Sequence, residues 1–168
     1  MSLRKLTQHD IKKIGTAVSL FDAARAMRLS KIGSIFIEDN AHFTGMITET
    51  DFVRKAIAGG LPFGETSAAS MASPLIEIDI EKLPRDANHL MHFNGVRHLA
   101  VSENEKIVGL LSVRDLVCHF LQDPDGPLTE MTDIFEPLTI LMHRDIHTID
   151  KTASVKEAAK KMATKKVG

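Results

Sequence analysis

The chain lacks tryptophan and tyrosine altogether and has a single cysteine, Cys118. Without Trp and Tyr, the usual stacking platforms for single-stranded nucleic acid are missing, and only Phe and His remain. One cysteine excludes an internal disulfide and is weakly consistent with a reducing compartment. No apolar run approaches the roughly 18 residues of a membrane span, and no apolar signal stretch opens the chain. We therefore expect a cytoplasmic protein with neither a nucleic-acid nor a membrane partner.

An excess of charge of one sign is also missing. The formal net charge is −1, and 43% hydrophobic with 26% charged residues is typical of an ordinary globular protein. A nearly neutral chain has no global attraction for nucleic acid or anionic membranes, so any anion-binding patch must be local. The length of 168 residues suits one domain or two small ones.

An internal repeat is the strongest feature of the sequence. Shifting the chain by 64 positions aligns identical residues without a gap. Periods longer than about 50 residues indicate duplicated small domains, not a solenoid. We therefore expect two equivalent units, residues 1–65 (repeat 1) and 66–122 (repeat 2), paired by pseudo-twofold symmetry with two clefts between them. The identical pairs are Ile14/Ile78, Asp22/Asp86, Ala23/Ala87, Met27/Met91, Asn40/Asn104, Gly45/Gly109, Asp51/Asp115 and Val53/Val117.

Each repeat is predicted to form a helix, two strands and a second helix. In repeat 1, Ser19 caps the first helix, strands cover 33–37 and 43–47, and Thr48 starts a helix that ends at 59–60. In repeat 2, a helix over 83–94 is followed by strands at 97–101 and 106–111 and a helix over 112–121. The apolar stripes of both second helices predict core or dimer interface.

A third, incomplete copy follows a linker at 123–140. At a shift of 71, residues 141–168 match the start of repeat 2 and stop where the first strand should begin. Such a fragment cannot form a complete unit alone, so we expect a longer protein with a downstream domain after Gly168. The first three residues, 1–3, look like an expression leader.

The residues that carry chemistry lie between the second strand and the second helix. Residues 45–51 and 109–115 both read Gly-apolar-apolar-Thr/Ser-x-x-Asp. A hydroxyl at a helix start, beside free N–H groups, is a ready phosphate site. An Asp one turn later offers only acceptors, which suits a ribose diol. The pattern predicts a nucleotide cradle with the ribose on the carboxylate.

A helix capping box, Ser/Thr-x-x-acid, is the alternative interpretation and needs no ligand. Two details favour a ligand. The reciprocal box prefers Glu or Gln, which reach back to the cap N–H, whereas both repeats use the shorter Asp. A glycine three residues before the hydroxyl leaves room for a ligand beside the backbone. Capping and binding by the same hydroxyl are compatible.

Taken together, the repeats resemble cystathionine-beta-synthase (CBS) domains, and the tandem resembles a Bateman module, over about residues 7–122. The resemblance implies an α+β fold of two βαββα-type repeats in a disc with two clefts. In many members these clefts bind AMP, ADP, ATP, NAD or S-adenosylmethionine. It implies that Asp51 and Asp115 hold ribose hydroxyls, with Thr48 and Ser112 near ribose or phosphate. Adenine would be lined by the segments containing Thr16 and Ile78, opposite Ser34 and His98.

The two clefts are predicted to be unequal. Repeat 2 carries Arg97, His98 and Arg114 where repeat 1 has Gly33, Ser34 and Thr50. A guanidinium suits phosphate in a fork geometry that Ser or Thr cannot match. We therefore favour the cleft with Asp115 for a phosphorylated ligand. The alternative is that Arg97 and Arg114 are solvated surface charges.

No catalytic or metal site is predicted. Cys118 lies mid-helix, and no nucleophile–base pair or phosphate loop occurs. The pairs His89/His92 and His143/His147 have metal-ligand spacing but lack an arranged third ligand. We predict a regulatory module that senses an adenine nucleotide and forms a homodimer through its second helices. The alternatives are a dimerisation scaffold with vestigial clefts, or the regulatory part of a larger enzyme.

Overall fold

The computed structural model describes residues 2–122, 142 and 144–167. The predicted linker at 123–140 and His143 lie outside these residues. Both repeats have the predicted βαββα order, in an α+β fold with two three-stranded sheets. After η1 (Leu3–Lys5), repeat 1 contains β1 (Lys13–Gly15), α1 (Leu20–Ser30), β2 (Ser34–Asp39), β3 (His42–Thr48), α2 (Glu49–Asp51) and η2 (Phe52–Ile57). Repeat 2 contains η3 (Ala68–Met71), β4 (Glu77–Asp79), α3 (Pro84–Asn94), β5 (His98–Glu103), β6 (Lys106–Ser112) and α4 (Val113–Gln122). The third copy contributes α5 (Val155–Lys165).

The two sheets share one topology and one register. In each, the first strand runs parallel to the second, and the second is antiparallel to the third. Ile14 lies opposite Ile37, and Ile78 lies opposite Val101 at the equivalent position. Both hairpins have a register shift at the same place, after Ile37 and after Val101. The duplication seen in the sequence is therefore preserved down to an irregularity of the strands.

The first helices begin and end as their sequences predict. The Ser19 hydroxyl accepts a hydrogen bond from the Asp22 N–H at 3.1 Å and caps α1. Gly95 ends α3 with a φ of 63°, a left-handed conformation that costs glycine little. Helix α5 is capped by Ser154 and ends at Lys166, which has a φ of 55°. The third copy thus has a side-chain cap at its helix start, as α1 does, and a left-handed residue after its end, as α1 and α3 do.

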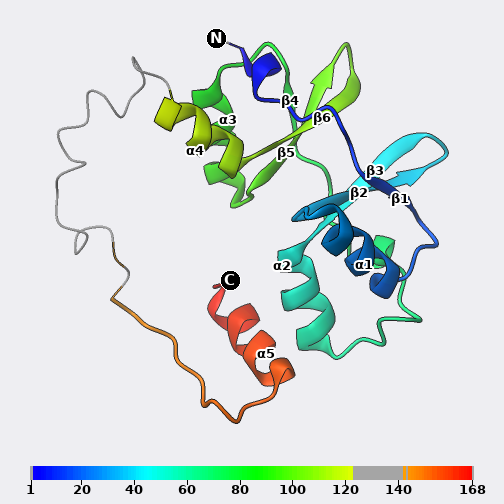
Figure 1. Ribbon diagram of the computed structural model, residues 1–168, viewed down its shortest axis with the longest axis vertical. Coiled ribbons are helices and arrows are strands. Elements are labelled where there is room, and N and C mark those ends of the chain that lie inside the picture. Colours follow the sequence, from blue (N-terminus) through cyan, green and yellow to red (C-terminus); the bar gives the residue numbers. More distant parts are fainter. Residues whose placement is uncertain (1, 123–141, 143, 168) are drawn as a thin grey trace.

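The second helix of repeat 1 differs from the regular helix predicted. After α2 it continues as a π-helical stretch, η2, whereas α4 of repeat 2 is α-helical throughout. Helix α5 packs against η2, and Figure 1 shows the two lying side by side. The wider π-helical turn therefore lies in the helix that α5 contacts.

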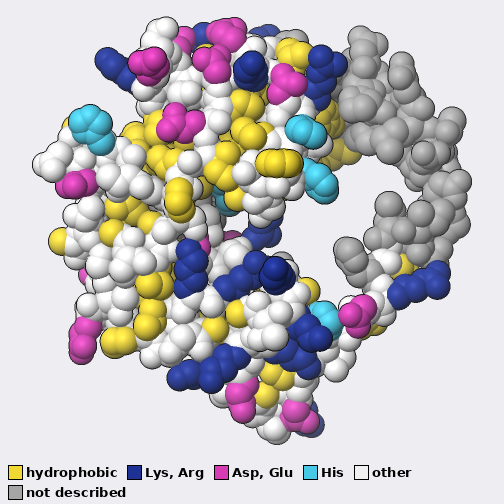
Figure 2. Space-filling view, turned by 180° about the vertical axis from the view of Figure 1, so that it is seen from behind, with side chains coloured by type: hydrophobic (Ala, Val, Ile, Leu, Met, Phe, Trp, Pro, Cys, Tyr) yellow, Lys and Arg dark blue, Asp and Glu magenta, His cyan; other side chains and the backbone are white. Residues whose placement is uncertain are grey.

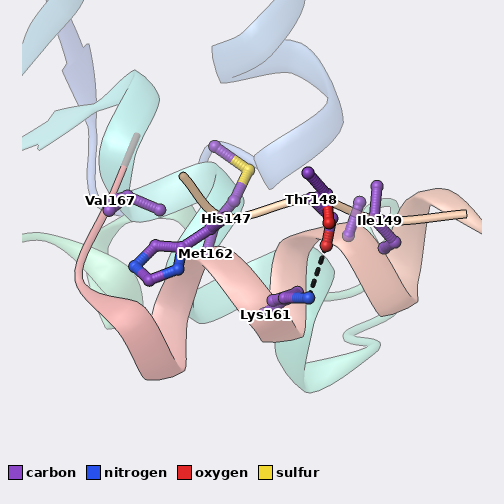
Figure 3. Close-up of a pocket in the computed structure, with 7 residues that line it drawn as sticks. His147, Thr148, Ile149, Lys161, Met162 and Val167 are labelled. Carbon is purple, nitrogen blue, oxygen red and sulfur yellow. Dashed lines mark hydrogen bonds between the residues drawn. The ribbon is translucent and has the colours of Figure 1, made fainter. Parts of the chain in front are cut away.

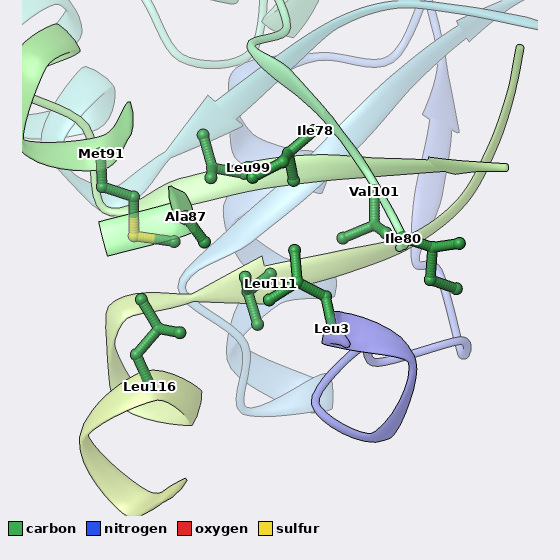
Figure 4. Packing of buried hydrophobic residues seen from close by; sticks show 9 residues of the cluster. All are labelled: Leu3, Ile78, Ile80, Ala87, Met91, Leu99, Val101, Leu111 and Leu116. Atoms are coloured by element: carbon green, nitrogen blue, oxygen red, sulfur yellow. The ribbon is translucent and has the colours of Figure 1, made fainter. Parts of the chain in front are cut away.

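Each repeat has its own apolar core, and Figure 4 shows that of repeat 2. Leu3 belongs to this core, with 0% of its surface exposed, and contacts the side of repeat 2 formed by Ile80 and Leu111. Leu3, one of the three residues interpreted as a leader, is therefore part of the folded unit. A third cluster of Phe36, Met46 and Ala100 joins the sheets of the two repeats.

Two segments cross from one repeat to the other. Residues 7–12, which precede β1, pair with β6 of repeat 2 through Gln8 and Leu110. Residues 72–76, which precede β4, pair with β3 of repeat 1 through Ser73 and Met46. We call these the first and second crossing segments. Because each repeat lends its leading segment to the other, the two form one structural unit.

The crossing segments explain the glycine of the repeated motif. A Cβ on Gly109 would collide with the Thr7 side chain and stand 2.8 Å from the Gln8 carbonyl oxygen. A Cβ on Gly45 would lie 3.1 Å from both Ala72 and the Ser73 carbonyl oxygen. The prediction that this glycine makes room for a ligand is therefore wrong, because the space is filled by the crossing chain.

In the described part of the chain, no helix is long and apolar enough to cross a bilayer.

We predict that Gly109→Ala destabilises the protein by about 1–3 kcal/mol, the usual cost of forcing an extra methyl group into a packed site. The loss should be smaller for Gly45→Ala, whose contacts are less severe. Gly64→Ala is the matched control, because a Cβ there meets nothing within 4 Å. Urea unfolding measures all three, and equal stability of the Gly109 and Gly64 variants would contradict the packing role.

Candidate functional site

The two motif aspartates lie at the starts of the second helices and close a capping box. Asp51 Oδ2 accepts hydrogen bonds from the Thr48 N–H at 2.8 Å and the Thr48 hydroxyl at 2.7 Å. Asp115 Oδ2 accepts from the N–H of Ser112 at the same 2.8 Å. The argument that Asp is too short to reach the cap N–H is therefore wrong. Capping is real in both repeats, and it engages Oδ2 of each aspartate.

In repeat 1 the second oxygen of Asp51 is held by a cation. Lys55 Nζ lies 2.7 Å from Asp51 Oδ1, and the Ser73 hydroxyl donates to the same oxygen at 3.1 Å. Lys55 also donates to the Met71 carbonyl at 2.9 Å and to Ser73 at 3.0 Å. Asp51 is only 6% exposed. Its carboxylate is thus buried and fully engaged by the protein itself.

In repeat 2 the second oxygen of Asp115 is held by a neutral amide. Gln8 Nε2, from the first crossing segment, lies 2.9 Å from Oδ1 and 3.0 Å from Oδ2. Asp115 is half-buried, and Gln8 is exposed. Position 119, which corresponds to Lys55, is a histidine. The two aspartates therefore differ in their surroundings: Lys55 and Ser73 contact the second oxygen of Asp51, and the exposed Gln8 amide contacts that of Asp115.

A small cleft adjoins Asp115 through Gln8. Its hollow measures about 20 Å³ and lies between the first crossing segment and the ends of strands from both repeats. Ser34, which is 4% exposed, forms part of its wall. A nucleoside needs a pocket of a few hundred Å³, roughly 300 or more, so any such ligand must displace part of the wall. The lining residues are Gln8, Asp10, Ile11, Lys12, Ile32, Ser34, Phe36 and Leu110.

Sequence reasoning missed the first crossing segment as a wall of the site. The signal was available in the repeat, because a shift of 64 aligns Ile11 with Leu75, and both contact the inter-sheet cluster. Their position before β1 and β4 placed them outside the predicted elements. The exchange of segments between repeats is a tertiary feature that spacing alone did not reveal.

Two predicted adenine-lining residues, Thr16 and Ile78, do not line this cleft. The parallel register places Gly15 opposite Glu38, so Thr16 follows at the end of β2 remote from Ser34. Ile78 is 7% exposed and packs in the core of repeat 2. The structure therefore brings Ser34 to the cleft but does not bring Thr16 or Ile78 there.

Arg97 links the starts of the two second helices. Its guanidinium donates to the Thr50 hydroxyl of repeat 1 at 2.8 Å, and its carbonyl accepts from the Val113 N–H at 2.9 Å. Arg97 thus reaches across to α2 instead of extending freely into solvent. Arg114 is exposed on α4. Arg97 and Arg114 thus both lie close to the residues at which α2 and α4 begin.

His98 lies beside Arg97 in the same region. Burial lowers the pKa of His98 below its ordinary value of 6.5, and the positive charge of Arg97 lowers it further. Asp115 and Glu49 oppose this effect by favouring the imidazolium. His98 is therefore neutral at pH 7, and its pKa is sensitive to any anion that enters.

Positive charge is concentrated on one part of the surface despite the neutral total. Figure 2 shows Lys and Arg side chains gathered over repeat 1 and the C-terminal helix, whereas acidic groups are more frequent over repeat 2. Helix α5 and its cap alone carry Lys156, Lys160, Lys161, Lys165 and Lys166. Such a local field attracts anionic ligands even when the net charge is near zero.

Histidine, cysteine and carboxylate side chains form no group of three or more that could hold a metal ion in residues 2–122, 142 and 144–167. His89 and His92 are both exposed on α3. Cys118 is a free, exposed thiol in α4.

The model of the CBS domain family matches residues 3–58, 67–121 and 133–168. Hypoxic response protein 1 of Mycobacterium tuberculosis is 27% identical over 118 residues, covering 69% of this chain and 82% of that protein. A CBS-domain containing protein of Agrobacterium tumefaciens superimposes with a TM-score of 0.67 at 26% identity, covering 71% of this chain and 98% of the other. A CBS domain protein of Pyrobaculum aerophilum, solved in complex with AMP, superimposes with a TM-score of 0.62 at 22% identity, covering 68% and 89%.

We predict that His98 makes the protein less stable in acid. A histidine whose pKa is lowered by folding binds its proton more readily in the unfolded chain, so stability falls as the pH drops below 6.5. The loss approaches about 1.4 kcal/mol per pH unit and levels off once the pH is below the lowered pKa. His98→Asn should flatten this part of the stability profile, measured by urea unfolding between about pH 7.5 and 5, the range in which histidine titrates. The same replacement at exposed His89 is the control, and identical profiles for wild type and His98→Asn would contradict the prediction.

Proposed function

We propose, because the chain belongs to the CBS domain family, that it is a regulatory module which binds an adenosine-containing nucleotide in the cleft beside Asp115. The ligand class comprises AMP, ATP, NAD and S-adenosylmethionine. One observation carries the proposal: the exposed amide of Gln8, which lines a small cleft between the repeats, donates to the outer oxygen of Asp115. A neighbour of the same fold has been solved in complex with AMP, which supports the ligand class.

The orientation of the ligand follows from the charges around the cleft. Ribose hydroxyls replace the Gln8 amide as donors to Asp115, because a carboxylate only accepts hydrogen bonds. Phosphate lies toward Arg97, Arg114 and the helix starts, where N–H groups and guanidinium groups favour an anion. His98 gains a proton more easily once phosphate is near. The base then occupies the space between the first crossing segment and Phe36.

Signal transmission follows from the same geometry. The ligand must displace Gln8, which is joined to β6 through backbone hydrogen bonds with Leu110 at 2.8 and 2.9 Å. That segment leads directly into β1 of repeat 1, so the change reaches both repeats. A ligand shifts such an equilibrium only by its difference in affinity for the two states. The ligand-free and ligand-bound states differ in the contact between Gln8 and Asp115, which the ligand replaces.

The catalytic alternative and the scaffold are separate hypotheses. The scaffold with vestigial clefts is favoured by one observation, namely that both aspartates already cap helices and the cleft is only about 20 Å³. If none of the four nucleotides raises the temperature of thermal unfolding, that result supports the scaffold. Nothing in the described residues resembles a catalytic pair, and a regulatory role within a larger enzyme stays compatible with the proposed binding.

The homodimer stays a prediction. In α4 the exposed fractions of Val117 and Leu121 are 51% and 69%, which leaves an apolar face for a partner. The equivalent residues of repeat 1, Val53 and Ile57, are half-buried in the helix that α5 contacts. If a dimer forms through second helices, α4 is therefore the available one, and light scattering measures its formation.

We predict that wild type binds AMP or a related nucleotide and that Asp115→Asn weakens binding about tenfold to a hundredfold. This is the loss of one charge-assisted hydrogen bond, about 1.5–3 kcal/mol. Asn keeps an acceptor for the helix cap, so the fold should survive, as thermal unfolding without ligand can verify. Isothermal titration with the four nucleotides measures affinity. Unchanged affinity in Asp115→Asn would contradict the proposed site.

We predict further that Lys55 closes the second cleft. Lys55→Ala frees Asp51 Oδ1 of its cation and should raise the number of bound nucleotides from one to two. Asp51→Asn added to this variant should remove the second site again, and Lys106→Ala, an exposed lysine on β6, serves as the control. Titration calorimetry gives the stoichiometry. One ligand per chain in both wild type and Lys55→Ala would refute the closing role of Lys55 without affecting the Asp115 site.

A further inference from the structure

The Arg97 side chain joins the starts of the second helices of the two repeats. Its guanidinium donates to the Thr50 hydroxyl in α2 at 2.8 Å, and its carbonyl accepts from the N–H of Val113, the first residue of α4, at 2.9 Å. Arg97 is thus fixed by its backbone to the helix that carries Asp115 and by its side chain to the helix that carries Asp51. A displacement of this guanidinium therefore changes the contacts of α2.

The duplication shows that this link runs in one direction. A shift of 64 places Gly33 where repeat 2 has Arg97, and Thr50 where repeat 2 has Arg114. The backbone half of the contact is kept, because the Gly33 carbonyl accepts from the Glu49 N–H at 3.1 Å. The side-chain half cannot form there, since glycine has no side chain. The side-chain link from the start of α4 to that of α2 therefore has no counterpart in the opposite direction.

Charges from both repeats meet around this link. His98, the next residue along the chain, is half-buried and experiences the charges of Arg97, Asp115 and Glu49. Arg97 is exposed, and its partner in α2 is a single neutral hydroxyl. A phosphate group accepts two parallel hydrogen bonds from a guanidinium, and both partners are then charged. A phosphate within reach of Arg97 therefore competes successfully with Thr50.

The start of α2 is connected to the third copy through a continuous helix. Helix α2 runs directly into η2, against which α5 packs. Ala159 of α5 is 3% exposed, and the Lys156 side chain lies against Gly60, just after η2. Lys161 Nζ donates to the Thr148 carbonyl oxygen and ties the preceding extended segment to α5, as Figure 3 shows. A change in α2 and η2 is therefore passed to both parts of the third copy.

We propose that Arg97 is a phosphate-operated link: a nucleotide phosphate in the cleft beside Asp115 draws the guanidinium away from Thr50 and releases the start of α2. This inference rests on the proposed function and adds which part of the ligand is sensed. The Gln8 contact responds to the ribose, and hence to any adenosine derivative, whereas Arg97 responds to the phosphate. Its side chain has two alternative partners, which is the kind of two-state element that coupling between distant sites requires. A ligand without phosphate occupies the cleft but leaves α5 unchanged.

The test compares AMP with adenosine, which lacks only the phosphate, on the full chain. Saturating AMP should shift the NMR signals of the Thr50 amide and the Ala159 methyl group, whereas saturating adenosine should shift neither. Thr50→Val removes the hydroxyl but keeps the shape of the side chain, so Arg97 is free before the ligand arrives. This variant should bind AMP about 1.5- to 5-fold more tightly, the equivalent of one exposed polar contact. Its affinity for adenosine should be unchanged, and its Ala159 signal should no longer respond to AMP.

Arg114→Ala is the matched control, because Arg114 also lies close to the start of α4 but does not contact Thr50. It should weaken AMP binding and leave the Ala159 response at saturation intact, whereas Arg97→Ala should weaken binding and abolish the response. An equal Ala159 response to adenosine and AMP, or a full response in Thr50→Val, would overturn the link and leave the nucleotide site standing. Failure of AMP to bind, or binding that Asp115→Asn does not weaken, would remove the site and the link together.

Discussion

The exchange of leading segments between the two repeats is the constraint on which the rest of the structure depends. Gln8 joins the sheet of repeat 2, and Ser73 joins the sheet of repeat 1. The same two residues donate to the motif aspartates, Asp115 and Asp51. The crossing segments therefore join the repeats, leave room only for glycine at positions 45 and 109, and form a wall of the cleft beside Gln8. Any molecule that entered this cleft would touch a segment that also holds the two repeats together.

Much of the fold was predictable from the sequence because its signals are local. The cap at Ser19, the left-handed end at Gly95 and the short apolar runs of the strands each specify structure within a few residues. The repeat then doubled every signal. The chain exchange was not predictable in this way, because Gln8 and Leu110 are distant in sequence and neither residue type is distinctive.

The candidate site was predicted only in part for the same reason. The aspartates were predicted because they recur in a motif, whereas Ser34, Thr16 and Ile78 were assigned by resemblance; of these three only Ser34 lines the described cleft. The length of Asp and the purpose of the motif glycine were misjudged from side-chain chemistry alone. Both depended on backbone geometry: the helix start brings the Asp51 carboxylate within 2.8 Å of its cap N–H, and the crossing chain fills the space beside Gly109.

The burial of Leu3 has a consequence for how the chain is made. Leu3 precedes both repeats in the chain, yet its neighbours include Ile80, Leu111 and Leu116. The Arg4 side chain likewise pairs with Glu81 and Glu103 of the second repeat. Leu3 and Arg4 can therefore be covered only once almost all of the second repeat has been synthesised. Folding of the first repeat by itself would leave them without these partners, so the pair is expected to reach its native state in one late, concerted step.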